Sequence, residues 1–289
     1  MTVTYLDNAL LAQLAAGHTF DIPRCAEVIE STLVEVNANT GVPDRLARWL
    51  HDHPGQPPPD ALFAGEPRLI IELSVSWNGA SELIMATALA VAKETGRPPA
   101  LFLTLHSPSL DIPMRVEIPL RAVFKHGAEL AGGYTVYLHA LLADDGREFV
   151  YYGITRRPWN LRFLEHVRAG HRTGAASRRL FARTLSQLIA ARAARRFGDS
   201  SIAGPALSGM ITALCLVGGT RDQALALEEY LVEKYSLAGK HLCGLNMIPG
   251  GTEGIRRAQR FRQRRPSVDL DETSLRELVH DPRAGPQEA

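Results

Sequence analysis

A short turn in the middle of the chain constrains the fold more than any other feature. Asp144-Asp145-Gly146 separates two runs, 134–142 and 148–154, in which polar residues interrupt apolar ones. Asp-Gly between such runs is a strong hairpin signal, because glycine tolerates the positive φ that tight turns require. The sequence therefore predicts an antiparallel hairpin in which every second side chain shares one face.

The segments after this hairpin predict a small α+β domain. Apolar spacing and helix-breaking residues predict helices at 160–168, 177–195 and 221–235, a strand at 212–217 and a closing loop at 237–251. An arginine-rich helical segment, 255–265, leads into a polar tail. We predict three regions: an α/β N-terminal domain (1–130), a β-sheet flanked by helices (131–252) and a C-terminal tail (253–289).

The N-terminal region predicts a different set of elements, separated from the hairpin by a glycine-containing junction at 127–133. Apolar residues recur with helical spacing in four segments, whereas three others are rich in β-branched and aromatic residues. The expected helices are 7–16, 23–36, 43–53 and 80–94, and the expected strands are 68–77, 100–106 and 114–124.

Composition indicates a folded protein whose charge is unevenly distributed. Hydrophobic residues make up 45% and charged residues 22% of the chain, which is typical of globular proteins. The net charge is only +1, but residues 1–130 are acidic whereas 131–253 and the tail are basic. Because arginine dominates the basic residues, the second half suits a polyanion, although a solvated helical surface would also explain the charge.

The same composition favours a cytoplasmic location. Cys25, Cys215 and Cys243 are widely spaced, with neither metal-binding spacing nor a disulfide framework. We expect no secretion signal and no membrane span. His51 and His53 have a spacing that could bind a metal, but no third ligand is evident, and we interpret them as surface histidines.

Five short motifs then follow one another in a specific order. The first is Thr135-Val136-Tyr137, the second is Tyr151-Tyr152-Gly153, and the third is a predicted helix in which Arg162 precedes His166 by four residues. In this order the chain resembles the GIY-YIG endonuclease family over about residues 131–251. The first triplet keeps only the tyrosine. The other two motifs are a helix with Glu228 in an apolar run and a closing Gly244-Leu245-Asn246 loop.

The resemblance implies a site made of Tyr137, Tyr151, Arg162, His166, Glu228 and Asn246. It implies that Tyr137 helps to activate a water molecule, that Tyr151 completes that hydroxyl network and that Asn246 braces the site. Arg162 and His166 share a helix face, which suits charge neutralisation and proton transfer at a phosphate. Glu228 would bind Mg²⁺ or Mn²⁺, because hard cations prefer carboxylate oxygens.

Each of these residues also has an ordinary structural interpretation. The tyrosines could be half-buried strand residues, Arg162 and His166 a solvated helix face, and Asn246 a loop residue. Glu229 is the alternative carboxylate, expected to point about 100° away from Glu228. Three nearby polar residues are secondary candidates that could assist catalysis or be bystanders: His139, His171 and Ser177.

The expected function is a metal-dependent DNA endonuclease of the restriction, repair or mobile-element type. Arg162 and the arginines at 256, 257 and 260 are the expected DNA contacts, because guanidinium groups fit phosphate oxygens. The acidic N-terminal domain is expected to bind a partner, recognise the target or form a homodimer. The alternative is a non-catalytic nucleic-acid-binding or adaptor protein that retains the fold.

Overall fold

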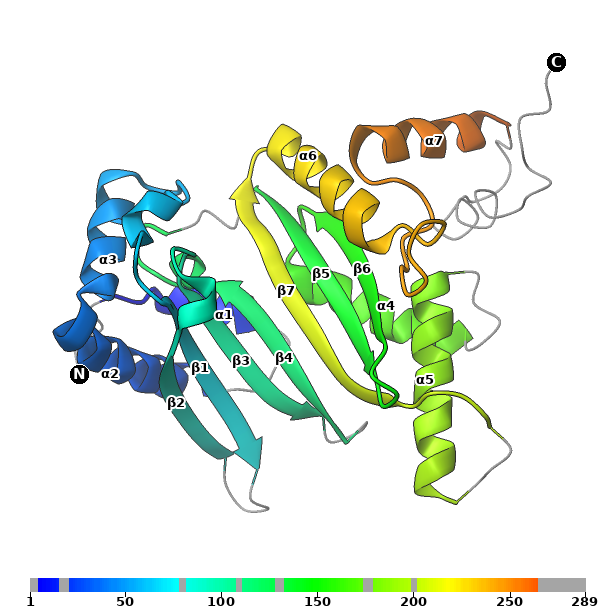
Figure 1. Ribbon diagram of the computed structural model, residues 1–289, viewed down its shortest axis with the longest axis horizontal. Coiled ribbons are helices and arrows are strands. Elements are labelled where there is room, and N and C mark those ends of the chain that lie inside the picture. Colours follow the sequence, from blue (N-terminus) through cyan, green and yellow to red (C-terminus); the bar gives the residue numbers. More distant parts are fainter. Residues whose placement is uncertain are drawn as a thin grey trace. The chain divides into compact units, whose positions relative to one another are not determined.

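The computed structural model describes residues 5–15, 21–77, 82–107, 111–127, 133–173, 179–198 and 202–264. The chain forms two compact units (Figure 1). One comprises Met1–Thr135, Arg156–Asn160 and Thr212–Gly219, and the other comprises Val136–Thr155, Leu161–Ile211 and Thr220–Ala289. Both contain helices and strands, which confirms the α+β class. Among the described helices, none is both long and apolar enough to cross a membrane.

Seven strands have the hydrogen-bonded order β2-β1-β3-β4-β7-β5-β6. Within the first unit, β1 is antiparallel to β2 and parallel to β3, and β3 is antiparallel to β4. The sheet is therefore mixed. The strand bounds are β1 Arg68–Trp77, β2 Glu82–Val91, β3 Ala100–Ser107, β4 Ile112–Pro119, β5 Tyr134–Ala143, β6 Glu148–Thr155 and β7 Leu207–Gly219.

The first unit has buried residues on both faces of its strands, with Ile70, Ala100 and Phe102 clustered on one of them. Along β1, Leu69, Ile71, Leu73 and Val75 are all buried, because every second side chain points to the same face. Helix α2 packs against β1 and β2. The helices of this unit are α1 Asn8–Ala15, α2 Ile22–Thr40 and α3 Val42–Asp52, with 3-10 turns at Asp60–Phe63, Ala92–Glu94 and Leu120–Ala122.

The predicted helix at 80–94 is wrong, because this segment forms strand β2 and a short 3-10 turn. The alanine-rich run Glu82–Val91 favours a helix locally, but it pairs along its whole length with β1. Ladder hydrogen bonds and the cover of α2 outweigh that local preference. The predicted strand 114–124 also ends earlier, because β4 stops at Pro119 and a 3-10 turn follows.

The predicted hairpin of the second unit is confirmed. The Ala143 amide donates to the Arg147 carbonyl across the turn between β5 and β6, and Gly146 has a φ of 85°. Strand β7 begins five residues before the predicted strand, and the predicted helix 221–235 ends as a π-helix, Val232–Ser236. The remaining helices are α4 Trp159–Thr173, α5 Leu180–Arg196, α6 Arg221–Leu231 and α7 Gly251–Arg264.

The two faces of the β5–β6 hairpin are covered by different helices. Tyr152 of β6 packs with Val232 and Leu237 of the segment after α6, and Leu138 and Val150 extend this cluster. The neighbouring side chains along both strands point to the opposite face, which α4 and α5 cover (Figure 1). The alternation of the hairpin therefore creates two separate environments.

Candidate active site in the second unit

Four of the aromatic side chains that the sequence singles out meet on the α4–α5 face of the hairpin. The Tyr151 ring lies 5.1 Å from the His166 ring and 6.4 Å from the Tyr137 ring, between ring centroids. His139 lies 4.6 Å from Tyr137 and 5.6 Å from His166. Phe181 of α5 closes the cluster, 5.2 Å from His166. Residues from β5, β6, α4 and α5 thus form one group, here called the ring cluster.

The Tyr137 hydroxyl and His166 Nε2 make the central polar contact of the ring cluster. They lie 3.3 Å apart, and the tautomer of the imidazole decides which group donates. Tyr137 and His166 are 1% and 3% exposed, so this contact is shielded from bulk water. A hydroxyl beside an imidazole can pass a proton to it, which is the arrangement that general base catalysis requires.

Gly153 makes room for the Tyr137 ring. A Cβ atom on Gly153 would lie 2.5 Å from the Tyr137 hydroxyl oxygen and 2.6 Å from the ring carbon that bears it. Both distances are shorter than real Cβ contacts allow. The glycine of the second motif therefore has a steric reason: it lets the tyrosine of the first motif cross the neighbouring strand.

His139 adds a second imidazole to the ring cluster, in a still more apolar setting. Burial holds its pKa well below the usual range, and the nearby His166 and Arg162 lower the pKa further. Its ring also lies 5.1 Å from Phe163. His139 is therefore neutral at physiological pH and adds no positive charge beside His166.

Arg162 comes from the same helix as His166, one turn earlier. Its guanidinium donates to the Glu165 carboxylate at 2.8 Å, and 22% of the Arg162 side chain is exposed. It also lowers the pKa of the buried His139, so its charge acts on the ring cluster. The positive charge of Arg162 is therefore partly exposed to solvent and also acts on the buried rings.

Glu228 is held at a different place in the same unit. Its Oε2 accepts the backbone N–H of Gly251 at 3.1 Å, at the first residue of α7, where helix geometry favours a negative charge. Its helix packs against β6 on the Tyr152 face of the hairpin, together with the π-helix. The structure therefore gathers Tyr137, Tyr151 and His166 directly, while Glu228 comes from the layer on the other face.

Asn246 fastens the closing loop to strand β6. Its side-chain oxygen accepts the Tyr152 amide at 2.8 Å and the Ser236 hydroxyl at 2.7 Å, and its side-chain nitrogen donates to the Tyr152 carbonyl at 2.7 Å. Next to it, the Leu245 amide donates to the Val150 carbonyl. The amide therefore continues the sheet edge as another strand would, and it braces the residue next to Tyr151.

Three of the four expected DNA-binding arginines, at 256, 257 and 260, lie on α7, which packs against α6, whereas Arg162 lies on α4. Arg257 donates to Glu253 at 2.9 Å, and this bond, with the charges of Arg260 and Arg256, lowers the pKa of Glu253. Arg256 and Arg260 are exposed. Of the other residues singled out from the sequence, Ser177 and the side chain of His171 lie outside the described part of the chain.

His51 lies in α3 and His53 caps its C-terminal end, and both contact neighbouring aromatic side chains. His53 stacks on Trp49 at 3.8 Å and bonds to the Trp49 carbonyl, while the His51 ring lies edge-on to His126. Among the described residues, no group of three or more His, Cys, Asp or Glu side chains could hold a metal ion. A site with a single carboxylate, such as one at Glu228, needs no such group.

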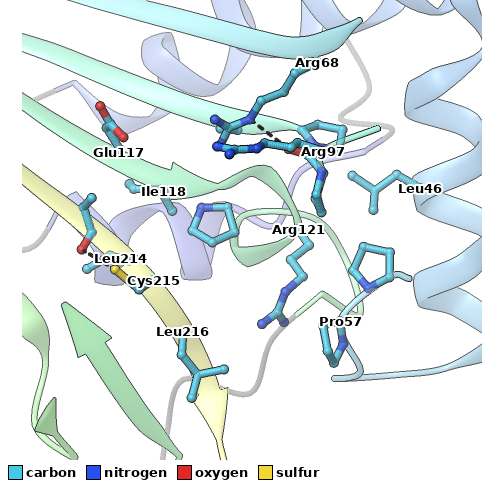
Figure 2. Close-up of a pocket in the computed structure, with 16 residues that line it drawn as sticks. Leu46, Pro57, Arg68, Arg97, Glu117, Ile118, Arg121, Leu214, Cys215 and Leu216 are labelled. Atoms are coloured by element: carbon cyan, nitrogen blue, oxygen red, sulfur yellow. Dashed lines mark hydrogen bonds between the residues drawn. The ribbon is translucent and has the colours of Figure 1, made fainter. Parts of the chain in front are cut away.

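The first unit contains a cavity of about 460 Å³ (Figure 2). Figure 2 shows Arg68 bonded to the Pro98 carbonyl, and Arg68 also pairs with Glu94. Arg121 is buried and donates to the carbonyls of Gly127 and Val217. Burial raises the pKa of Glu117, which also lines the cavity. These bonds show how the structure places the charged groups around the cavity, and none involves a residue of the expected site.

Sequence reasoning gave too little weight to three residues of the ring cluster. His139 was a secondary candidate, although its position two residues after Tyr137 already places it on the same strand face. Phe163 and Phe181 read as ordinary apolar residues of helices, and only the packing of α4 and α5 brings them onto the hairpin. No local pattern in the sequence indicates that packing.

No family model, no curated protein and no solved structure matches this chain. The function of these residues is therefore inferred from their own geometry and chemistry.

Proposed function

We propose that this protein is a metal-dependent DNA endonuclease with a GIY-YIG type of site. The observation that carries the proposal is the meeting of Tyr137, Tyr151 and His166, which come from three separate segments. A phosphodiester is hydrolysed by a water molecule that must lose a proton while negative charge develops on the phosphate. A hydroxyl–imidazole pair beside a cationic helix face serves both needs.

Each residue of the site has a role that follows from its contacts. The phenol of Tyr137 ordinarily titrates near pH 10, so His166 is needed to take up or return its proton at neutral pH. Arg162 neutralises the charge that develops on the phosphate oxygens. Tyr151 packs against His166 and fixes the plane of the imidazole. Asn246 holds β6 in register, and it is a positioning residue.

Glu228 fits the role of metal ligand in this proposal. Mg²⁺ and Mn²⁺ take oxygen ligands, and Mg²⁺ commonly uses one or two carboxylates and keeps its waters. A carboxylate has about four lone-pair positions, so a hydrogen bond such as the one that Glu228 accepts from Gly251 is compatible with binding a cation. The bound cation would supply Lewis-acid stabilisation of the phosphate oxygens.

The helix that begins at Gly251 provides the proposed grip on DNA. Arg256 and Arg260 are exposed on it, and neutralising phosphates releases counterions. Replacing both arginines by glutamine should weaken binding and reduce the slope of log K against log salt by about 0.9 for each lost phosphate contact. A slope that stays unchanged would remove α7 from the binding surface.

The endonuclease proposal is tested by incubating the purified chain with plasmid, branched and single-stranded DNA. Each reaction contains Mg²⁺, Mn²⁺ or EDTA. Cleavage that requires the cation is the expected result, and the substrate that is cut distinguishes restriction, repair and mobile-element activity. Absence of cleavage on every substrate with either cation refutes the proposal.

Matched variants assign the roles. Glu228→Gln and Arg162→Gln should each reduce cleavage by about a hundredfold or more, as expected for charges that stabilise the transition state, while DNA binding persists. Glu229→Gln and Arg168→Gln are the controls, because both residues are exposed neighbours on the same helices. Loss of cleavage in Glu229→Gln but not in Glu228→Gln would reassign the metal ligand.

One observation favours a second candidate, a nucleic-acid-binding protein that retains the fold without cleaving. Tyr137, His139, Tyr151 and His166 are each 3% exposed or less, so a phosphate reaches them only if α4 or α5 moves. DNA binding that depends on α7, combined with no cleavage under any condition, supports this candidate. Cleavage that Tyr137→Phe abolishes without loss of stability excludes it.

A further inference from the structure

Strand β2 forms an open edge of the first unit. It is the terminal strand in the sheet order and pairs with β1. Three large apolar side chains on it are exposed: Leu83 by 43%, Met85 by 52% and Leu89 by 45%. All three lie on the face that carries Ile70 and Phe102. Leu89 is opposite Ile70, whereas Met85 and Leu83 are opposite Ser74 and Ser76. In the described part of the chain, no strand continues the sheet beyond β2.

Strand β2 lacks the features that usually prevent an edge strand from pairing with a strand of another molecule. Natural edge strands are usually short, or interrupted by proline, a bulge or a charged residue, because unpaired N–H and C=O groups attract another strand. The run 83–91 contains no proline and no charged residue, and its pairing with β1 is continuous. Such a long, uncharged edge is expected to be covered by another strand.

The sequence of the edge is complementary to itself. Counting outward from Thr87, Ala86 matches Ala88, Met85 matches Leu89 and Leu83 matches Val91. If a second copy of β2 ran antiparallel with Thr87 opposite Thr87, each exposed apolar residue would face another apolar residue. Cross-strand pairs of this kind are the unit of sheet stabilisation, and a twofold axis makes each pair occur twice.

We propose that the protein forms a twofold dimer in which β2 pairs antiparallel with β2 of a second copy, centred on Thr87. The backbone groups of the two edges form the ladder. The odd-numbered side chains Leu83, Met85, Leu89 and Val91 form an apolar stripe across it, with the polar Thr87 pair at its centre. The proposal does not depend on nuclease activity, since a monomeric nuclease and an inactive dimer are both recognisable outcomes.

The oligomeric state in solution tests the proposal first. Sedimentation analysis of the full chain should show a dimer, and Thr87→Lys should raise the dimer dissociation constant by at least about tenfold, because two lysines would then face each other. Within each chain the substituted side chain lies opposite Glu72 on β1, so the monomer should stay folded, which circular dichroism checks. Gln56→Lys, in an exposed loop, is the charge-matched control.

Cysteine cross-linking tests the register. In a background with Cys215 and Cys243 replaced by serine, Thr87→Cys should form an intermolecular disulfide on oxidation, because cross-strand Cβ atoms lie about 4.5–5.5 Å apart. Leu83→Cys should not, since the two copies of residue 83 would be separated by about 27 Å, eight residues at roughly 3.4 Å each. A chain that is monomeric at high concentration, a dimer that Thr87→Lys leaves intact, or cross-linking at 83 rather than 87 overturns the proposal.

Discussion

Replacing Gly153 by alanine should destabilise the second unit, although the general preference of the backbone predicts the opposite. Gly153 lies inside β6 and does not have a positive φ. Alanine at such a position ordinarily stabilises a protein by about 0.4–1 kcal/mol, because glycine loses more conformational freedom on folding. Any cost must therefore come from packing.

The packing cost follows from the contacts that a Cβ atom would make. It would lie 2.5 Å from the Tyr137 hydroxyl oxygen and 3.1 Å from a second ring carbon, in a cluster where Tyr137 is 1% exposed. Overpacking a buried site costs about 1–3 kcal/mol. Displacing the ring also lengthens its 3.3 Å contact with His166, which adds roughly 0.5–1.5 kcal/mol. The expected net loss is about 1–3 kcal/mol after the backbone gain is subtracted.

Urea denaturation followed by tyrosine fluorescence and circular dichroism measures this loss. With an m-value of about 1–3 kcal/mol/M, the midpoint should fall by roughly 1 M. The decisive comparison uses the Tyr137→Ala background, in which the ring is absent and Gly153→Ala should cost nothing or stabilise slightly. If Gly153→Ala is as stable as the parent protein, or costs the same in both backgrounds, the ring does not lie where we describe it.

Three further predictions concern single side chains. Asn246→Ala should lower the free energy of unfolding by about 2–5 kcal/mol, measured by thermal unfolding, because it leaves the buried N–H and C=O of Tyr152 without their side-chain partner. The Tyr152 amide should then exchange its hydrogen faster, and unchanged protection of that amide would contradict this role. His139 is neutral in the folded protein, but in the unfolded chain it is protonated below about pH 6.5. The free energy of unfolding should therefore fall as the pH drops below that value, by up to about 1.4 kcal/mol per pH unit, and His139→Phe should make this pH dependence less steep. Cys215 is exposed, but the surrounding protein and Glu117 raise the pKa of its thiol to about 12. At pH 8 it should therefore react with iodoacetamide at least about tenfold more slowly than an unperturbed thiol, and Glu117→Gln should speed the reaction.

Local chemistry explains why much of the fold could be predicted from the sequence. The hairpin was predictable because Asp145-Gly146 can form only a few turns, and helix α6 was predictable from its start, where Thr220 and Gln223 form a capping box. The prediction of a helix at 82–91 was wrong for the opposite reason. Its alanines favour a helix, and only pairing with β1, a partner at another place in the chain, selects the strand.

The site was predictable to the same extent. Spacing alone places Tyr137 beside His139 on one strand face and Arg162 beside His166 on one helix face, because those periodicities are local. The contact of Tyr137 with His166 joins residues 29 positions apart, and the burial of both depends on Phe181 of yet another helix. Half-buried tyrosines and a solvated helix face were the ordinary structural interpretation of these residues, and no local pattern indicates how completely α4 and α5 cover Tyr137, Tyr151 and His166.

That burial links the stability of the second unit to its proposed chemistry. A buried tyrosine–histidine contact has a low local dielectric, so a charge on either group interacts more strongly with its neighbours than it would in water. The neutral His139 beside it keeps the number of buried positive charges low, and Arg162 supplies positive charge from the solvent side. A phosphate that approached Arg162 would bring a negative charge towards His166 and favour its protonated form, which is the state that neutral His166 reaches once it has accepted the proton of Tyr137. The ring cluster is therefore a core in the free protein whose proton affinity a bound polyanion would raise, and this is how the same residues can serve packing and catalysis.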